Sequence, residues 1–339
     1  MRNNSESIEY SDEPTELDLK CAELIKMFEA SRFSLDDFRG RRNYDEAQID
    51  RDQAKLNQKM AQYKLRENEM SALDQDKVLE AMLQYMGSHD QIFVQKSYAE
   101  PGTDFDDSFN GADVVFGLPR PNGQQDVIFN IDACTATSYP AVAKKFQRSD
   151  EYSKPDSPSC NRLSYFAHNN TRTRISPSPH YIIGSMPAHV SNAADKFEIG
   201  ATEIRNEVDE SFRRKILIEL YIQSKTGNLA CENIENPTDF TEKARNAHRT
   251  VIRATERALC QSFDIDIKSE NAYAEMISNI QNFMRENRKN DDTFHYICHE
   301  SLERLNQETA KKRARVIVKT TKNLGDKVDS IQTEPKKLA

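Results

Sequence analysis

The sequence predicts an α/β core with long helical flanks. Two short apolar runs of strand-like composition, residues 112–118 and 127–131, enclose a turn rich in proline and glycine at residues 119–123. From about residue 199 onward the apolar residues recur with helical spacing instead. Only 37% of the 339 residues are hydrophobic and 30% are charged, which indicates one modest core carrying solvated helices.

The N-terminal part is expected to contribute helices but no strands. Residues 1–16 are polar and acidic and include Pro14, so we expect them to be disordered. A short helix is expected at residues 17–33. A charged helix with a thin apolar stripe is expected at residues 44–70. We therefore assign residues 17–71 to a helical arm.

The core is expected to span residues 72–198. Asp74 or Asp76 offers an N-cap for a helix whose broad apolar face stops at Gly87. Residues 92–98 then have the composition of a strand, and the hairpin follows. The later core elements are a helix that begins near Pro140 and two strands, expected at residues 140–148, 163–166 and 180–183. Two polar stretches between them are expected to be loops: residues 151–159, and Asn169 and Asn170 with Thr171 and Thr173.

The rest of the chain is expected to be helical. Residues 199–320 form a predicted helical domain, and residues 321–339 a flexible tail. The predicted helices of this domain cover residues 204–223, 241–263, 272–288 and 293–318.

Charge and cysteine usage limit the broad class. The net charge of −8 does not favour wholesale wrapping of nucleic acid, although local basic patches matter more than the total. One such patch, better explained as a solvated helix face, comprises Lys311, Lys312, Arg313, Arg315, Lys319 and Lys322. The six cysteines form no CxxC pair, which suits reduced thiols in a cytoplasmic protein. No apolar run is long enough to span a membrane, and the first residues lack a secretory apolar segment.

Each apolar run of the hairpin carries an aspartate. Asp113 opens the first run and Asp132 closes the second. An unpaired carboxylate at the end of a central strand is costly unless it is hydrogen-bonded, charge-paired or bound to metal. Magnesium prefers oxygen ligands and keeps several waters, so two carboxylates and a substrate phosphate can suffice to hold it. The hairpin therefore predicts a divalent-metal site at Asp113 and Asp132.

The order helix–strand–strand–strand–helix–strand around these aspartates is similar to the core of the PD-(D/E)XK nuclease superfamily. That resemblance covers residues 72–184 and implies a restriction-endonuclease-like αβββαβ fold. It also implies that Asp113 and Asp132 bind Mg²⁺, or Mn²⁺, for hydrolysis of nucleic-acid phosphodiesters. The segment also resembles a group of uncharacterised bacterial proteins in which an Ile-Asp-x-Thr pattern closes the third strand.

The chain departs from this family at the lysine that usually follows the second acid by two residues. Cys134 stands there, and a thiol cannot hold positive charge beside a phosphate. Some members supply the lysine from the following helix, which here contains Lys144 and Lys145. Val142 and Phe146 are one helical turn apart and define the buried face. Lys145 lies nearer that face, so we predict Lys145 as the third catalytic residue.

Several neighbouring residues have a structural or a functional interpretation. Further acidic ligands are sought among Glu80, Glu100, Asp106 and Asp107, of which Asp106 and Asp107 are more often turn or solvated acids. Asp132 has a structural alternative, a hydrogen bond to Thr135 or Thr137. Cys134 as a nucleophile, and His168, His180 and His189 as metal ligands, are less favoured than core or surface roles. The sequence contains no P-loop, dinucleotide or zinc signature.

Three functional hypotheses follow. The first is a Mg²⁺-dependent nuclease that uses Asp113, Asp132 and Lys145. The second is a nuclease-like fold without activity whose helical arms bind a protein partner, motivated by Cys134 and the acidic net charge. The third is a plain helical scaffold with the hairpin as a minor insertion. Oligomeric state, and the choice between DNA and RNA, stay open at this point.

Overall fold

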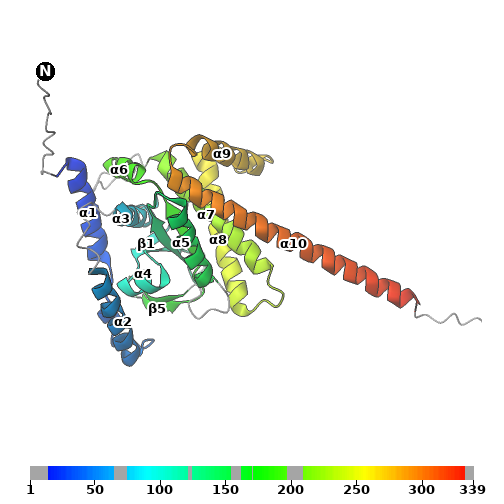
Figure 1. Ribbon diagram of the computed structural model, residues 1–339, viewed down its shortest axis with the longest axis horizontal. Helices are drawn as coiled ribbons and strands as arrows, with labels where there is room; N and C mark the ends of the chain where they lie inside the picture. The colour runs from blue at the N-terminus through cyan, green and yellow to red at the C-terminus, as the bar shows by residue number, and fades with distance from the viewer. Residues whose placement is uncertain are drawn as a thin grey trace, which may run out of the picture.

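The computed structural model describes residues 14–64, 75–120, 124–153, 162–169, 171–196 and 209–332. These residues form a mixed α/β fold in which helices surround one small sheet (Figure 1). The sheet contains β1 (Tyr98–Pro101), β2 (Val114–Leu118), β3 (Val127–Cys134) and β6 (His180–Gly184), in that spatial order. The first three strands form an antiparallel meander, and β6 pairs parallel to β3.

Helices precede, connect and follow these strands. Within the N-terminal half they are α1 (Glu16–Ser31), the 3₁₀ turn η1 (Leu35–Phe38), α2 (Glu46–Lys64), α3 (Gln75–Ser88), α4 (Asp104–Asn110), α5 (Tyr139–Ser153) and α6 (Pro187–Asp195). The C-terminal helices are α7 (Glu210–Glu232), α8 (Asp239–Ser262), α9 (Ala272–Asn287) and α10 (Asp292–Gln332). A separate two-stranded sheet contains β4 (Leu163–His168) and β5 (Thr171–Ile175).

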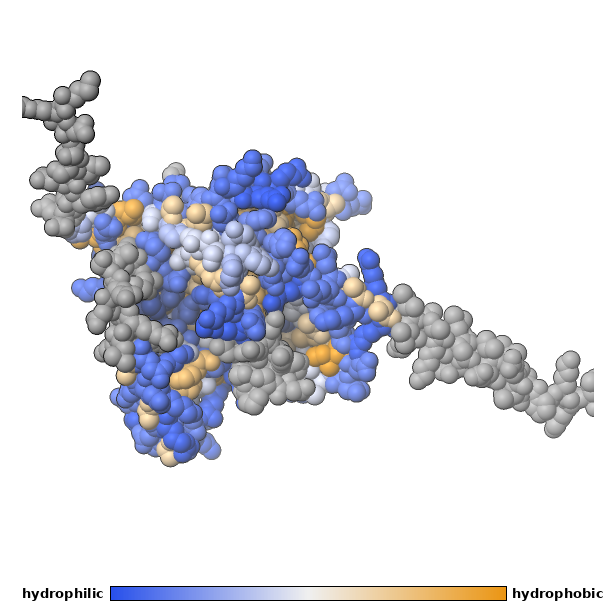
Figure 2. All heavy atoms as spheres, in the orientation of Figure 1, coloured by the Kyte–Doolittle hydropathy of each residue, from blue (hydrophilic) through white to orange (hydrophobic). Residues whose placement is uncertain are grey.

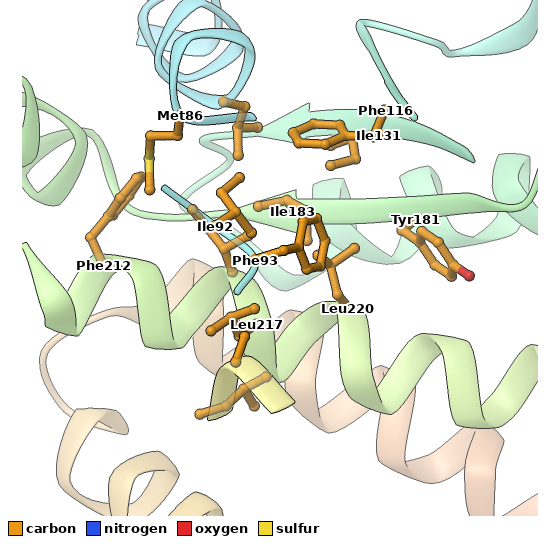
Figure 3. Close-up of a cluster of buried hydrophobic side chains, with 14 of the residues drawn as sticks. Met86, Ile92, Phe93, Phe116, Ile131, Tyr181, Ile183, Phe212, Leu217 and Leu220 are labelled. Atoms are coloured by element: carbon orange, nitrogen blue, oxygen red, sulfur yellow. The ribbon is translucent and has the colours of Figure 1, made fainter. Parts of the chain in front are cut away.

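The alternation of side chains along the strands gives the sheet two covered faces. Phe116 and Ile131 point to the face covered by α3 and α7, in the main apolar cluster (Figure 3). Ile128 points the other way and packs against the β4–β5 sheet. Ile182 packs beneath α5 and α10 on that second face. Fully buried strands of this kind read as continuous apolar runs, which explains why the hairpin was recognisable in the sequence.

The C-terminal helices share the main core. Leu217 and Leu220 of α7 lie in one apolar cluster with Leu24 of α1 and Ile183 of β6. The boundary expected near residue 199 therefore does not coincide with a break in the packing. α1 likewise belongs to this core, whereas α2 packs through Ile49 in a smaller cluster. α10 extends well beyond the body (Figure 1) and continues to Gln332, so the segment expected to be a tail from residue 321 begins as helix.

The strand expected at residues 92–98 is wrong except for its last residue. Ile92 and Phe93 are both buried, and Val94 is 54% exposed, which breaks the alternation that a strand requires. The backbone there bonds to side chains instead of a neighbouring strand: Arg213 Nε donates to the Ile92 carbonyl. The amide of Ser97 donates to Asp90. The segment inserts two side chains into the core and then leads into β1.

Four further elements were missed: α4, β5, the 3₁₀ turn η1 and α6. α4 is a single short helix capped by Thr103 and ended by Gly111 in the left-handed conformation, too short to show apolar periodicity. β5 was predicted as a polar loop because its side chains are mostly exposed and polar. It pairs with β4 through a turn at Asn169, whose φ is 50°. α5 also continues to Ser153, past the end expected near residue 148.

Other expectations are confirmed or fall outside the described residues. The helices expected at 17–33, 241–263 and 272–288 agree with α1, α8 and α9. The strands expected at 163–166 and 180–183 agree with β4 and β6. Lying outside the described residues are 1–13, 65–74, 121–123, 154–161, Asn170, 197–208 and 333–339. Most of the segment predicted to be disordered, most of the turn at 119–123 and Asp74 are among these.

Figure 2 shows that hydrophilic side chains dominate the visible face of the molecule. Apolar side chains appear there only in scattered patches. Among the described residues, no helix is long and apolar enough to cross a membrane.

Candidate functional site

The register of the hairpin brings Asp113 and Asp132 together. Val114 of β2 pairs with Ile131 of β3, and the Asp113 amide continues the ladder by donating to the Ile131 carbonyl at 3.0 Å. Asp113 therefore lies opposite Asp132 on the same face of the sheet. Both residues are 8% exposed. The Ala133 amide donates to Asp113 Oδ2 at 2.7 Å, which fixes the orientation of this carboxyl group.

Lys145 reaches the same position from α5. Its Nζ donates to Asp132 Oδ1 at 2.5 Å and also to the Ala133 carbonyl. Val142 and Phe146 are buried on either side of it, whereas Lys144 is exposed. Burial by itself lowers the pKa of Lys145, but the charges of Asp132 and Asp113 outweigh it and raise that pKa. Lys145 is therefore a firmly charged ammonium group beside Asp132.

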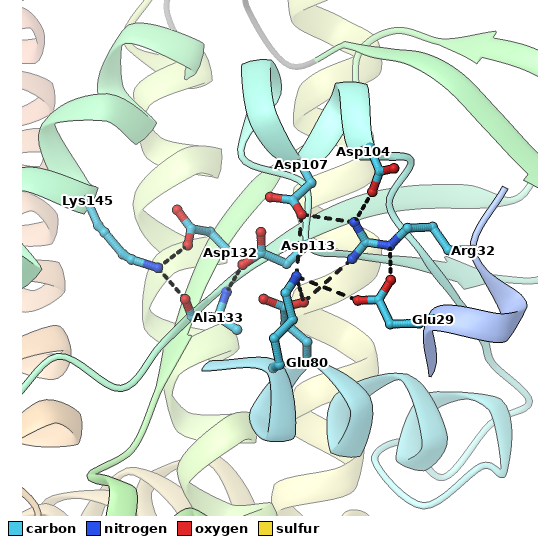
Figure 4. Close-up of polar contacts among 10 residues, drawn as sticks. Glu29, Arg32, Glu80, Asp104, Asp107, Asp113, Asp132, Ala133 and Lys145 are labelled. Atoms are coloured by element: carbon cyan, nitrogen blue, oxygen red, sulfur yellow. Dashed lines mark hydrogen bonds and ion pairs between the residues drawn. The ribbon is translucent and has the colours of Figure 1, made fainter. Parts of the chain in front are cut away.

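Two further acidic side chains lie at the site, on helices α3 and α4, which precede the hairpin in the chain. Glu80 on α3 is 4% exposed, and Asp107 on α4 faces it across two cations (Figure 4). Lys77 Nζ lies 2.7 Å from Glu80 Oε2 and 3.6 Å from Asp107 Oδ2. Arg32, at the end of α1, lies 3.0 Å from Asp107 and 3.7 Å from Glu80. The structure thus adds Arg32 and Lys77, which sequence reasoning missed, to the acidic group.

The cations do not fully compensate the carboxylates. The acidic group contains three cations, Arg32, Lys77 and Lys145, and six carboxyl groups, Glu29, Glu80, Asp104, Asp107, Asp113 and Asp132. Burial and then the charges of Glu80, Asp107 and Asp132 raise the pKa of Asp113 well above its ordinary value. Burial raises the pKa of Glu80 to about 7, although Lys77 opposes this. Lys77 and Arg32 overcome burial at Asp107 and lower its pKa. The site therefore stores unfavourable negative charge around Asp113.

Asp106 has a structural role. It is fully buried and accepts hydrogen bonds from the amides of Ser164 at 2.8 Å and Tyr165 at 2.9 Å. It therefore fastens β4 to α4 and is not a solvated turn acid. Glu100 pairs with His168 at 2.7 Å, so it too is engaged elsewhere.

Thr135 does not satisfy Asp132. Its amide and hydroxyl both donate to Asp76 Oδ1, at 2.7 and 2.5 Å. Asp76 lies in the first turn of α3. Two residues, not one, separate Asp132 from Thr135, so the Ile-Asp-x-Thr pattern is only approximated here. The structural alternative through Thr135 is therefore wrong, and Asp132 is held by Lys145.

Cys134 and His180 are buried, whereas His189 is partly exposed. Burial raises the pKa of the Cys134 thiol to about 11, so the thiolate nucleophile is scarce near neutral pH. His180 is buried between the Ser149 hydroxyl at 3.0 Å and the Gly111 carbonyl at 2.9 Å. Burial lowers the pKa of His180, which keeps the ring neutral. His189 bonds the Asn290 carbonyl at 2.6 Å.

The donor set of the site suits a hard divalent cation. Asp113 and Asp132 lie opposite each other on one face of the sheet, and excess negative charge around Asp113 favours a cation. No group of three or more His, Cys, Asp or Glu side chains within the described ranges is arranged to hold a metal ion. Glu80 and Asp107 are directed at Lys77 and Arg32 instead. Two protein carboxylates are therefore the ligands that this conformation offers.

A cavity of about 800 Å³ lies elsewhere, between α5, β6, α7, α8 and α10. Its lining includes His180, Phe146 and His248 but none of the acidic residues of the site. The charged side chains on its wall are already paired: Arg304 with Glu300, and Lys311 with Glu308. Asp113, Asp132 and Lys145 do not line this cavity, although the charges of Asp132 and Lys145 act on His180 in its wall.

Comparison with known proteins adds no relative. No protein-family model, no curated protein and no solved structure matches the chain.

Proposed function

We propose that this protein is a divalent-metal-dependent hydrolase of nucleic-acid phosphodiesters with a restriction-endonuclease-like core. The observation that carries the proposal is the meeting of Asp113, Asp132 and Lys145 at one end of the β2–β3 hairpin. Burying two opposed carboxylates and one lysine, which come from three different elements, costs free energy of folding. Such arrangements of perturbed titratable groups are typical of functional sites.

The strand order supports the finer assignment of the fold. An antiparallel β1–β2–β3 meander is followed by α5 and by β6 parallel to β3, with α3 packed in front. This is the arrangement expected of an αβββαβ core of the PD-(D/E)XK type. In this chain α4 is inserted between β1 and β2, and the β4–β5 sheet between α5 and β6.

Asp113 and Asp132 are the residues that would hold Mg²⁺ or Mn²⁺. A bound divalent ion supplies charge that polarises a phosphoryl oxygen and makes a coordinated water more acidic. The ammonium group of Lys145 donates to Asp132 Oδ1 at 2.5 Å. Asp113 must lose its proton to become a ligand, because its pKa is raised.

Lys145 would stabilise the negative charge that develops on the phosphate. Its Nζ is already held by Asp132 and the Ala133 carbonyl, so little reorganisation is needed when the substrate arrives. It thereby takes the role of the lysine that is replaced by Cys134 in the strand. The helix α5 holds it in place through the buried residues Val142 and Phe146.

A second candidate is a nuclease-like fold that binds a partner and has no activity. The observation in its favour is that Glu80 and Asp107 already pair with Lys77 and Arg32. A site completed by internal cations needs no metal. Titration with Mg²⁺ separates the two candidates, since the inactive fold has no metal affinity at Asp132.

The test is a cleavage assay on single- and double-stranded DNA and RNA, with Mg²⁺, with Mn²⁺ and with a chelator. Asp132→Asn is compared with the control Asp126→Asn, which removes a carboxylate near the start of β3 that bonds Tyr98. Metal-dependent cleavage should persist in Asp126→Asn and disappear in Asp132→Asn. The asparagine oxygen still accepts a hydrogen bond from Lys145, so the melting temperature should stay close to that of the wild type. Cleavage by Asp132→Asn at the wild-type rate would refute the proposal.

A further inference from the structure

Cations stand on both sides of the carboxylate pair. Lys145 approaches Asp132 from α5, while Arg32 at the end of α1 lies on the other side of Asp113 (Figure 4). Lys77 on α3 shares the partners Glu80 and Asp107 with Arg32. A nucleic-acid strand carries a phosphate at every nucleotide. A strand whose scissile phosphate lies at Asp113 and Asp132 therefore places its neighbouring phosphates toward the two flanks.

Arg32 has hydrogen-bonding capacity that the described residues leave unused. Its side chain is 7% exposed, and its Nη1 donates to Asp104 at 2.8 Å and to Asp107 at 3.0 Å. Its Nε and Nη2 are buried and have no hydrogen-bond partner among the residues that the structure describes. Nε lies 3.6 Å from Glu29 and Nη2 lies 3.7 Å from Glu80. At these distances the groups attract each other as ions but do not form a hydrogen bond. Unfilled donors on a buried guanidinium are costly unless a ligand fills them.

Lys77 is the member of this pair that solvent reaches. Its side chain is 28% exposed, compared with 27% for Asp107 and 53% for Asp104 around it. Burial lowers the pKa of Lys77, but Glu80 and Asp107 outweigh it and raise that pKa, so the group is firmly cationic. A divalent cation at Asp113 and Asp132 would offset part of the excess negative charge that Glu80 and Asp107 add around Asp113. The positive charge of Lys77 would then be available to an incoming phosphate.

We propose that Lys77, with Arg32 behind it, is a second phosphate-binding point of the site. It would contact the phosphate next to the scissile one, on the side of α1 and α3. The substrate class that follows is a polynucleotide strand continuing past the cut on that side, not a mononucleotide. The inference rests on the proposed function, because it places the scissile phosphate at Asp113 and Asp132.

The test measures binding and not turnover. Fluorescence anisotropy follows labelled single-stranded DNA and RNA oligonucleotides on the full-length protein, with Ca²⁺ in place of Mg²⁺ to suppress cleavage, over a series of salt concentrations. The variants are Lys77→Gln, Lys77→Arg and the control Lys55→Gln. Lys55 also pairs with an acid one turn away, Asp52 at 3.3 Å, but lies on α2, outside the site. The control thus removes the same charge and the same kind of ion pair.

Losing one phosphate contact on a single strand lowers the slope of log affinity against log salt by about 0.7. We expect this reduction in Lys77→Gln, its recovery in Lys77→Arg and the wild-type slope in Lys55→Gln. An unchanged slope in Lys77→Gln, or an equal loss in Lys55→Gln, would overturn the inference. An unchanged slope in a protein that cleaves would leave the proposed function standing. A reduced slope without cleavage would keep the phosphate contact and remove the hydrolase. A wild-type protein that neither binds nor cleaves would remove both.

Discussion

Replacing Glu80 with glutamine should change how the stability of the protein depends on pH. The Glu80 side chain is 6% exposed and lies 2.7 Å from Lys77. Burial raises its pKa to about 7 from an ordinary value of 4.5, with Lys77 opposing the rise and Asp107 adding to it. The unfolded chain therefore releases this proton at lower pH than the folded protein does. The protonated Glu80 side chain makes its full contribution to the unfolding free energy below pH 4.5. This contribution is lost as the pH rises to about 7.

The magnitude follows from the two pKa values. Each pKa unit corresponds to about 1.4 kcal/mol, so the difference between about 7 and 4.5 corresponds to about 3 kcal/mol of unfolding free energy. Glutamine does not titrate, and the Glu80→Gln variant should lack this loss. The difference in unfolding free energy between Glu80→Gln and the wild type should therefore change by about 3 kcal/mol between pH 4.5 and pH 8. The change should favour the variant.

Urea unfolding followed by circular dichroism measures this gap directly at each pH. The matched control is Glu46→Gln, since Glu46 is 54% exposed and pairs with Arg39 at 3.1 Å. Its gap to the wild type should stay constant over the same range. A constant gap for Glu80→Gln as well would refute the view that the site stores unfavourable charge.

Three further predictions concern neighbouring parts of the structure. Lys145→Met should abolish cleavage and lower the free energy of unfolding by about 2 kcal/mol, measured in urea, because it removes the charged hydrogen bond to Asp132. Gly87→Ala should cost about 1–3 kcal/mol in the same assay, because the added Cβ would lie 2.3 Å from the Phe116 ring where α3 meets β2. Cys134 should resist iodoacetamide at pH 8 in the folded protein and react after unfolding, because burial raises its pKa to about 11. Rapid labelling of the native protein at Cys134, located by peptide mass spectrometry, would contradict its assignment to the core.

The centre of the site was visible in the sequence because it is local. Asp113 and Asp132 lie at matching ends of two apolar runs joined by a short turn, so antiparallel pairing alone places them opposite each other. The spacing of Val142 and Phe146 then selects Lys145 over Lys144 by helical geometry. These inferences need only the periods of strand and helix.

The flank of the site was not visible because it depends on tertiary packing. Arg32 comes from α1, remote in sequence from the hairpin, and its partners become evident only when α1 packs on α3. Lys77 lies in the first turn of α3, and nothing in the local sequence indicates that it faces Asp107 of α4. The segment at Ile92 and Phe93 was misassigned for a related reason: its backbone bonds to Arg213 of α7, and local composition carries no trace of such a partner.

Calorimetric titration of Mg²⁺ and Mn²⁺ into the wild type and into Asp132→Ala tests the central claim most directly. We expect the wild type to bind metal and to release protons, because Asp113 holds its proton until a cation replaces it. The measured heat should then depend on the ionisation enthalpy of the buffer, and affinity should rise with pH. Asp132→Ala should lose this binding. Absence of binding in the wild type, or equal binding in Asp132→Ala, would contradict a metal site at the hairpin.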